Sequence, residues 1–199
     1  NYLTILHKAL AVAQEWGLLK VVPPVKWLKV PPIKFDFLTF EEADRLLAAA
    51  DPEWRTMIMV ALKTGLRQGE LLALTRDDVD LVAGRLVVNR NLSRGELTTP
   101  KNGRTREIPL GDIVTVELKR ERHLRSDLIF CNKNGQSLTS GECKHPLYRA
   151  CKRAGLRRIG WHVLRHTFAS HLVMRGATIK AVQELLGHAT IEMTMRYAH

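Results

Sequence analysis

Apolar residues recur at helical spacing over most of the chain. Residues 2–19 place Leu and Ala near one face, and Gly17 is suited to end that helix. A second helix is predicted to begin at Thr39, because Glu42 three residues later completes a capping box. A third begins at Asp51-Pro52 and runs to Gly65, since proline favours the first turn of a helix.

The pattern then changes from helical spacing to short runs rich in β-branched residues. After a short helix over 67–74, "GRLVVNR" and "TREIPL" read as strands, and "PKNG" is predicted to be a hairpin turn between "ELTT" and "TREIPL". A helix is expected from Asp112, and "LIF" at 128–130 reads as a short strand. This pattern predicts a small antiparallel sheet.

Everything after the last predicted strand has helical spacing. Helices are expected over 141–154, 161–174, 178–186 and 190–198, with Thr190 capping the last one. Left-handed glycines are expected beyond three of the helix ends, at Gly155, Gly176 and Gly187. The predicted fold class is α+β: a mainly helical domain with one small antiparallel sheet beside it.

Proline pairs divide the chain into two parts. The stretch "VVPPVKWLKVPPIKFDF" cannot lie inside a helix and favours extended, semi-rigid chain. We therefore predict an interdomain linker over 21–36. A single helix cannot form a core, so 1–20 is expected to be the end of an upstream domain, with a second domain over 37–199.

Charge changes the picture more than composition does. A net charge of +11 and a pI of about 10.0 favour a polyanionic partner such as nucleic acid, and the competing interpretation is a ribosomal-type or merely soluble basic protein. The three cysteines include no C-x-x-C pair, which argues against a disulfide framework or a zinc ribbon. With no apolar run of membrane-spanning length and no leader pattern, we expect a cytoplasmic protein that does not bind membranes.

Several charged side chains have both an ordinary and a chemical interpretation. Arg67 and Glu70 lie three apart on a predicted helical turn, which is typical of a surface ion pair. Lys101 lies at the predicted hairpin tip with Arg104 and Arg106 close by. These charges either guard a solvated turn or deliver a mobile ammonium to a phosphate, where a desolvated lysine can act as a general acid.

The closing stretch, from residue 162 to residue 199, collects His162, Arg165, His188 and Tyr197 around predicted helix ends. A zinc hydrolase would use the i, i+4 histidine pair that starts at His162, but Val163 stands where the general-base Glu belongs. A helix-turn-helix module with its recognition helix over 190–197 would bind DNA without catalysis. Phosphoryl transfer to a tyrosine needs cations around the phosphorus, a proton donor and an in-line nucleophile.

Two separated segments carry a family resemblance. "ALKTGLRQGELLAL", together with "HVLRHTFASHLVMRGATIKAVQELLGHATIEMTMRYAH", resembles the tyrosine recombinase (phage integrase) family, in the same chain order and with the hairpin lysine between them. The match covers about 37–199, and H-x-x-R followed by L-G-H and a tyrosine nine residues later is highly specific. The helix in 1–20 resembles the last helix of the upstream DNA-gripping domain in this family.

The resemblance implies site-specific DNA recombination through a covalent 3′-phosphotyrosine. In that reading Arg67 and Arg165 clamp the scissile phosphate, and His188 donates to the same oxygens. His162 acts on the proton of the nucleophile Tyr197. Lys101 protonates the leaving 5′-oxygen, and Glu70 orients Arg67. The remaining hairpin arginines, Arg104 and Arg106, are implied to contact DNA.

The resemblance also implies partners and limits. Double-stranded DNA is the expected partner, with a self-tetramer on two DNA sites, no cofactor, no metal and a bacterial or phage-encoded origin. The family's C-terminal tail is expected to be truncated here, and weak DNA binding with impaired assembly follows for this chain. A related topoisomerase could use the same residues, and a catalytically silent helix-turn-helix binder stays the alternative from another class.

Overall fold

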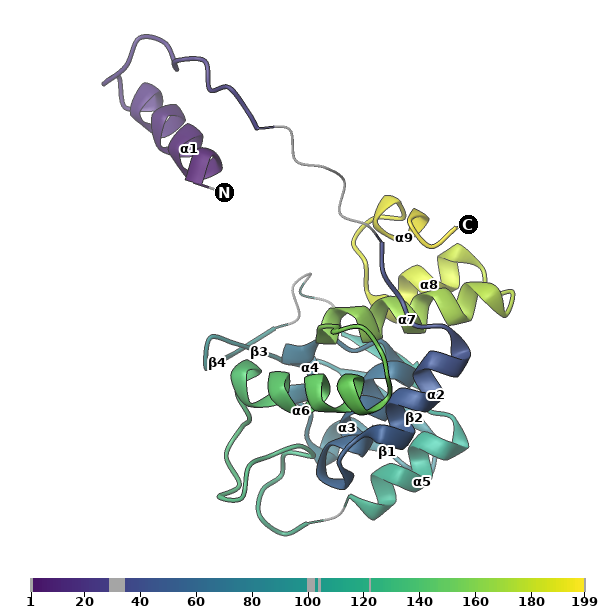
Figure 1. The fold of residues 1–199 in the computed structure, drawn as a ribbon. Coiled ribbons are helices and arrows are strands. Elements are labelled where there is room, and N and C mark those ends of the chain that lie inside the picture. The colour runs from purple at the N-terminus through teal and green to yellow at the C-terminus, as the bar shows by residue number, and fades with distance from the viewer. Residues whose placement is uncertain (1, 29–34, 100–102, 104, 122, 199) are drawn as a thin grey trace. The chain divides into compact units, whose positions relative to one another are not determined.

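A computed structural model describes residues 2–28, 35–99, 103, 105–121 and 123–198 (Figure 1). The chain divides into two compact units, Asn1–Phe35 and Asp36–His199. The first holds α1 (Tyr2–Glu15), which buries none of its residues and gives way to a turn with Gly17 in the left-handed region. The predicted helix is confirmed but ends earlier than residue 19, and part of the predicted linker, 29–34, lies outside the described residues.

The second unit begins with three helices whose ends follow from local capping. At the start of α2 (Phe40–Ala49), the hydroxyl of Thr39 accepts a hydrogen bond from the amide of Glu42. The carboxylate of Glu42 in turn accepts a hydrogen bond from the amide of Thr39. Next come α3 (Pro52–Thr64), with its proline in the first turn, and α4 (Gln68–Leu72). All three predicted helices are confirmed.

Two small sheets follow. The first has the antiparallel order β1 (Val79–Asp80), β2 (Arg85–Val88), β5 (Arg106–Pro109). The second pairs β3 (Asn91–Ser93) with β4 (Glu96–Thr98). The predicted pairing of "ELTT" with "TREIPL" is therefore wrong. The reason is burial: β2 and β5 share an apolar inner face, whereas all of β4 is exposed.

The "PKNG" turn falls largely outside the described residues, and so do Lys101 and Arg104. The predicted strand at 128–130 is also wrong in kind. Leu128 forms only an isolated bridge with Thr75, although Ile129 and Phe130 are buried in the core as the apolar run suggests.

The remaining helices are α5 (Asp112–Arg120), α6 (Ser140–Arg153), α7 (Trp161–Met174), α8 (Ile179–Leu186) and α9 (Glu192–Met195). Positive φ angles at Gly155, Gly176 and Gly187 confirm the predicted helix ends. The last helix is much shorter than predicted and is not capped by Thr190. Its end tightens into i→i−3 hydrogen bonds, among them the amide of Tyr197 to the carbonyl of Thr194.

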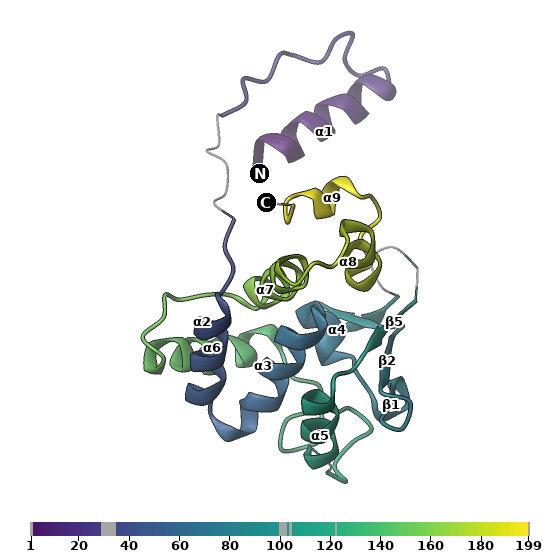
Figure 2. The same cartoon turned by 90° about the vertical axis from the view of Figure 1, so that its right-hand side faces the viewer.

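The core of the second unit forms around α3, which is buried continuously from Thr56 to Leu62. Helix α7 packs against α3, and α8 contacts both α7 and β5 (Figure 2). This arrangement gathers the end of α3, the start of β5 and the whole of α7 and α8 in one region. No helix in the described part of the chain combines the length and apolar character needed to cross a bilayer.

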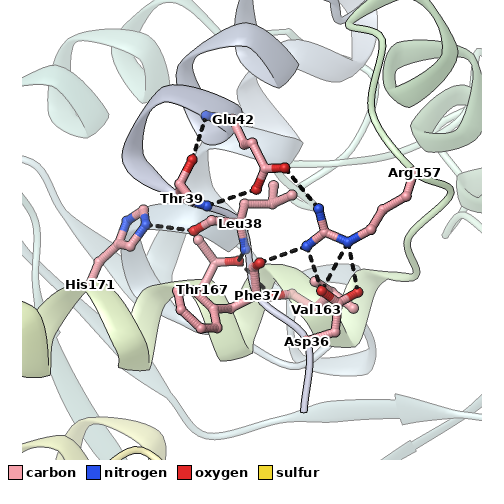
Figure 3. A network of polar contacts seen from close by, with 9 residues as sticks. All are labelled: Asp36, Phe37, Leu38, Thr39, Glu42, Arg157, Val163, Thr167 and His171. Atoms are coloured by element: carbon pink, nitrogen blue, oxygen red, sulfur yellow. Dashed lines mark hydrogen bonds and ion pairs between the residues drawn. The ribbon is translucent and has the colours of Figure 1, made fainter. Parts of the chain in front are cut away.

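A polar network ties the start of the second unit to α7 (Figure 3). The guanidinium of Arg157 donates to the carboxylates of Asp36 and Glu42 and to the carbonyl of Phe37. Two further hydrogen bonds belong to this network and involve Leu38, Thr167 and His171. We call the whole network, which joins 36–42 to Arg157 and α7, the junction clamp. The Leu38 amide donates to the Thr167 hydroxyl at 3.0 Å, and its carbonyl lies 2.8 Å from Nε2 of His171.

Replacing Arg157 by Met is expected to loosen this junction. The hydrogen bonds and charge of Asp36 raise the pKa of Arg157, but the side chain is 41% exposed and solvent weakens each pair. We expect a loss of about 1 kcal/mol, or about 2–4 °C in melting temperature, measured by circular dichroism. Arg149→Met is the control, because Asp51 keeps a second partner in Arg153. Equal melting of the two variants would contradict a specific role for the clamp.

Candidate active site

The turn between α3 and α4 positions Arg67. Gly65 ends α3 in the left-handed region at φ 64°, and a Cβ there would run into the ring of Phe168. Glycine is required here both by the backbone angle and by the close approach of α7. Arg67 then becomes the N-cap residue of α4, where its amide donates to Oε2 of Glu70 at 2.8 Å.

Glu70 is a buried hub and not a surface ion-pair partner. Its Oε1 accepts from Nη1 of Arg67 at 2.9 Å, and both of its oxygens accept from Arg106, at 3.0 and 2.7 Å. Burial alone would raise the pKa of the Glu70 carboxyl, but hydrogen bonds and charge from Arg106, and then from Arg67, hold it below its usual value. The carboxylate therefore fixes two guanidiniums at once.

Arg106 was expected to contact DNA, but its side chain is only 8% exposed. Besides the pair with Glu70, its Nε donates to the carbonyl of Leu185 at 2.9 Å. Gly187, at φ 62°, lets the end of α8 approach closely, since a Cβ there would lie 3.0 Å from Cδ of Arg106. The structure thus places Arg106 as a brace between Glu70 and the end of α8.

Arg165 bridges two helix ends from within α7. It is 1% exposed, and its Nη1 and Nη2 donate to the carbonyls of Gly65 and Leu186 at 2.7 and 2.6 Å. Carbonyls at a helix end lack partners within the helix and attract cations. Burial, then the charge of Arg67, lowers the pKa of Arg165 to about 9. A buried cation bonded here to neutral carbonyls would be stabilised by an anion beside it.

Tyr197 lies against α7 with its hydroxyl beside a histidine. Oη of Tyr197 is 2.7 Å from Nδ1 of His166, and the tyrosine is 2% exposed. Burial raises the pKa of Tyr197, although the charge of Arg165 opposes this. The ring of His162 lies edge-on to that of His166, with centroids 4.4 Å apart. A phenol, two imidazoles and a buried guanidinium therefore share one site.

His188 completes this group from the segment after α8. Its Nδ1 is 2.9 Å from the hydroxyl of Thr194, and its ring stacks at 12° to that of Tyr197, with centroids 6.4 Å apart. Burial, followed by the charges of Arg165 and Arg67, lowers the pKa of His188 to about 4. The imidazole is therefore neutral at neutral pH and can donate one hydrogen bond without adding charge.

The structure brings together five of the residues selected from the sequence: Arg67, His162, Arg165, His188 and Tyr197. Within the described ranges, no group of three or more His, Cys, Asp or Glu residues is placed to hold a metal ion. In the sequence, His166 was interpreted only as the second histidine of the possible metal pair that starts at His162. Its position one turn after His162, on the same face of the helix, was the signal that it belongs to the site.

The region that holds this site matches a known family. Residues 36–199 match the model of the phage integrase family, which is most of the chain. The chain therefore belongs to the phage integrase family.

Two curated relatives and one solved structure show how far the likeness extends. The chain is 30% identical over 209 residues to tyrosine recombinase XerC of Thermodesulfovibrio yellowstonii, covering 99% of this chain and 69% of the relative. It is 34% identical over 179 residues to tyrosine recombinase XerD of Listeria monocytogenes, covering 81% of this chain and 57% of the relative. The Tn1549 transposon integrase, solved with a circular intermediate DNA, shares the fold at a TM-score of 0.87 and 23% identity, covering 98% of this chain and 72% of that one.

Proposed function

We propose that this chain carries the catalytic domain of a tyrosine-type site-specific DNA recombinase. It would cut one DNA strand at a time and rejoin it through a covalent 3′-phosphotyrosine on Tyr197. The observation that carries the proposal is the buried Tyr197 hydroxyl, which lies 2.7 Å from Nδ1 of His166 and within the electrostatic influence of Arg165 and Arg67. The family match and the XerC and XerD relatives support the same chemistry.

The two arginines are proposed to clamp the non-bridging oxygens of the scissile phosphate. Guanidiniums stay charged and donate parallel hydrogen bonds, which suits a phosphate. Arg67 is held by Glu70, and Arg165 is held by two helix-end carbonyls, so both are oriented before substrate arrives. His188 would add a neutral donor to the same oxygens.

The proposed reaction exchanges one phosphodiester for another. Tyr197 Oη attacks the phosphorus, the bond to the 5′-oxygen breaks, and Lys101, which lies outside the described residues, protonates that oxygen. Because the phosphotyrosine conserves the bond energy, rejoining needs no nucleotide cofactor. Burial, and then neighbouring cations, lower the pKa values of Arg165 and His188 in the free protein, and the phosphate charge would balance those cations.

Double-stranded DNA is the proposed partner, and four copies of the whole protein on two DNA sites are the proposed assembly. The net charge of +11 favours a polyanion, and the Tn1549 integrase of the same fold was solved with DNA. We place this chemistry in the cytoplasm of a bacterium or a phage host. A silent helix-turn-helix binder is disfavoured, because α9 (Glu192–Met195) is a single turn of four residues, too short for a recognition helix that lies in a DNA groove.

Covalent capture tests the proposal. The chain is mixed at low salt with a pool of nicked random duplexes, denatured, and the DNA that remains attached to protein is sequenced. We expect adducts that survive denaturation, with the 3′-phosphate linked to the peptide that contains Tyr197 by mass spectrometry. A protein that shifts the duplexes on a native gel but yields no adduct would overturn strand transfer by this site.

A further inference from the structure

We propose that His166, and not His162, takes the phenolic proton of Tyr197 as the tyrosine attacks, an inference that rests on the proposed recombinase function. This gives a chemical role to a residue that sequence reasoning set aside with the metal-site interpretation. Since the group touches the reacting oxygen, it would be a catalytic residue.

Geometry is the first support. Nδ1 of His166 lies 2.7 Å from Oη of Tyr197, which is hydrogen-bond distance to the atom that must lose a proton. His166 belongs to the fourteen-residue α7, whereas Tyr197 follows the four-residue α9. The long helix α7 thus holds the proton acceptor His166 in place, whereas the nucleophile Tyr197 follows the short helix α9. We infer the tautomer with its proton on Nε2, because it lets the phenol donate to Nδ1.

Before DNA binds, the protonation states of His166 and Tyr197 suit a proton transfer from the phenol to the imidazole. Burial, then His162, Arg196 and Arg165, lowers the pKa of His166 to about 4, so its imidazole is neutral. The carboxylate of Asp36, at the start of the second unit, acts in the opposite direction and raises the pKa of His166. Tyr197 itself is kept protonated by burial. An incoming phosphate brings negative charge to the same cations and therefore raises the basicity of His166 as the reaction begins.

The proton balance closes in both directions. In cleavage, the Oη–H bond of Tyr197 breaks, its proton moves to Nδ1 of His166, and Oη forms the bond to phosphorus as the 5′-oxygen leaves with a proton from Lys101. In rejoining, a 5′-hydroxyl gives its proton to the neutral amine of Lys101 and attacks the phosphorus. The bond between Oη and phosphorus breaks, and the imidazolium of His166 returns its proton to Oη. No oxidant, metal or further reactant is required.

His162 has a different relation to the nucleophile. Its side chain is exposed, and its ring lies edge-on to His166 at a centroid distance of 4.4 Å and an interplanar angle of 79°. A proton on one of these rings disfavours a proton on the other, so only one of them can accept at a time. We assign His162 to positioning the ring of His166.

The test compares two DNA substrates that carry a site recovered by covalent capture. One has the normal bridging 5′-oxygen and the other a bridging 5′-sulfur, whose thiolate leaves without a proton. We measure first-order adduct formation for the wild type, His166→Gln, His166→Ala and His162→Gln, with His171→Gln as the control from the same helix. DNA binding and melting temperature are recorded for each variant.

We expect His166→Gln to slow adduct formation about 10²–10⁴-fold on both substrates, with DNA binding retained. Added imidazole should restore part of the rate of His166→Ala, which a merely structural role would not allow. A Lys101→Ala variant, in contrast, should recover on the sulfur substrate alone. His171→Gln should form adducts at the wild-type rate, although loss of its bond to the Leu38 carbonyl lowers its melting temperature.

Each other outcome overturns something definite. If His166→Gln reacts at the wild-type rate, or if His162→Gln is the slower variant on the sulfur substrate, His166 is not the acceptor and the proposed function still stands. If His166→Ala is slow and imidazole does not restore it, the residue is structural. If the wild type itself forms no adduct, the proposed function fails first.

Discussion

Tyr197→Phe is expected to abolish covalent protein–DNA adducts completely while the variant still folds and binds duplex DNA. The change removes one oxygen, which is the proposed nucleophile, and leaves the buried ring in place. Losing the hydrogen bond to Nδ1 of His166 should lower the free energy of unfolding by about 1 kcal/mol. Adducts are measured on denaturing gels, binding on native gels at low salt, and folding by thermal denaturation.

Tyr148→Phe is the matched control. This tyrosine lies on α6, where the guanidinium of Arg158 stacks 3.6 Å above its ring, and it takes no part in the proposed chemistry. It should form adducts at the wild-type rate. Adducts that persist in Tyr197→Phe would show that another residue attacks, and the proposed mechanism would then be wrong at its central step.

The helices of the second unit were predictable because their end signals are local. A hydroxyl and a carboxylate three residues apart define the start of α2, and a left-handed glycine defines the end of α3. Strand pairing is not local. Nothing within "ELTTPKNGRTREIPL" indicates that Ile108 pairs with Leu86 in a buried sheet, which only the packed core decides.

The candidate site divides in the same way. The family resemblance implied that Arg67, Arg165 and Tyr197 would gather, and the structure places them in mutual electrostatic contact. Spacing could not show which imidazole reaches the phenol, because both histidines share a face of α7. Nor could it show that Arg106 turns inward, since a basic residue near a hairpin tip is usually solvated.

Glu70→Gln is expected to weaken both the fold and the reaction. The side chain keeps its shape but loses its charge, which leaves Arg67 and Arg106 close together without a counter-ion. Breaking a buried pair in this way should lower the free energy of unfolding by roughly 3 kcal/mol, or roughly 6–12 °C in melting temperature. Adduct formation should fall by about 10²-fold, because Arg67 loses the carboxylate that aims it.

The pH dependence separates this charge effect from a packing defect. The pKa of Glu70 in the folded protein is below its unfolded value, so its stabilisation is fully present above the unfolded pKa. It is lost as the pH falls through the folded pKa, where the carboxyl takes up a proton. The difference in unfolding free energy between the wild type and Glu70→Gln should therefore be constant near neutral pH and shrink below about pH 4.

Glu117→Gln provides the comparison for this measurement. Its carboxylate also meets two arginines, Arg55 at 3.1 Å and Arg120 at 3.2 Å, but those partners are 39% and 72% exposed and stay solvated when the charge is removed. It should melt close to the wild type and cleave at the wild-type rate. If Glu70→Gln behaves in the same way, the buried carboxylate does not hold the arginines, and the preorganised phosphate clamp must depend on the helix-end carbonyls around Arg165 alone.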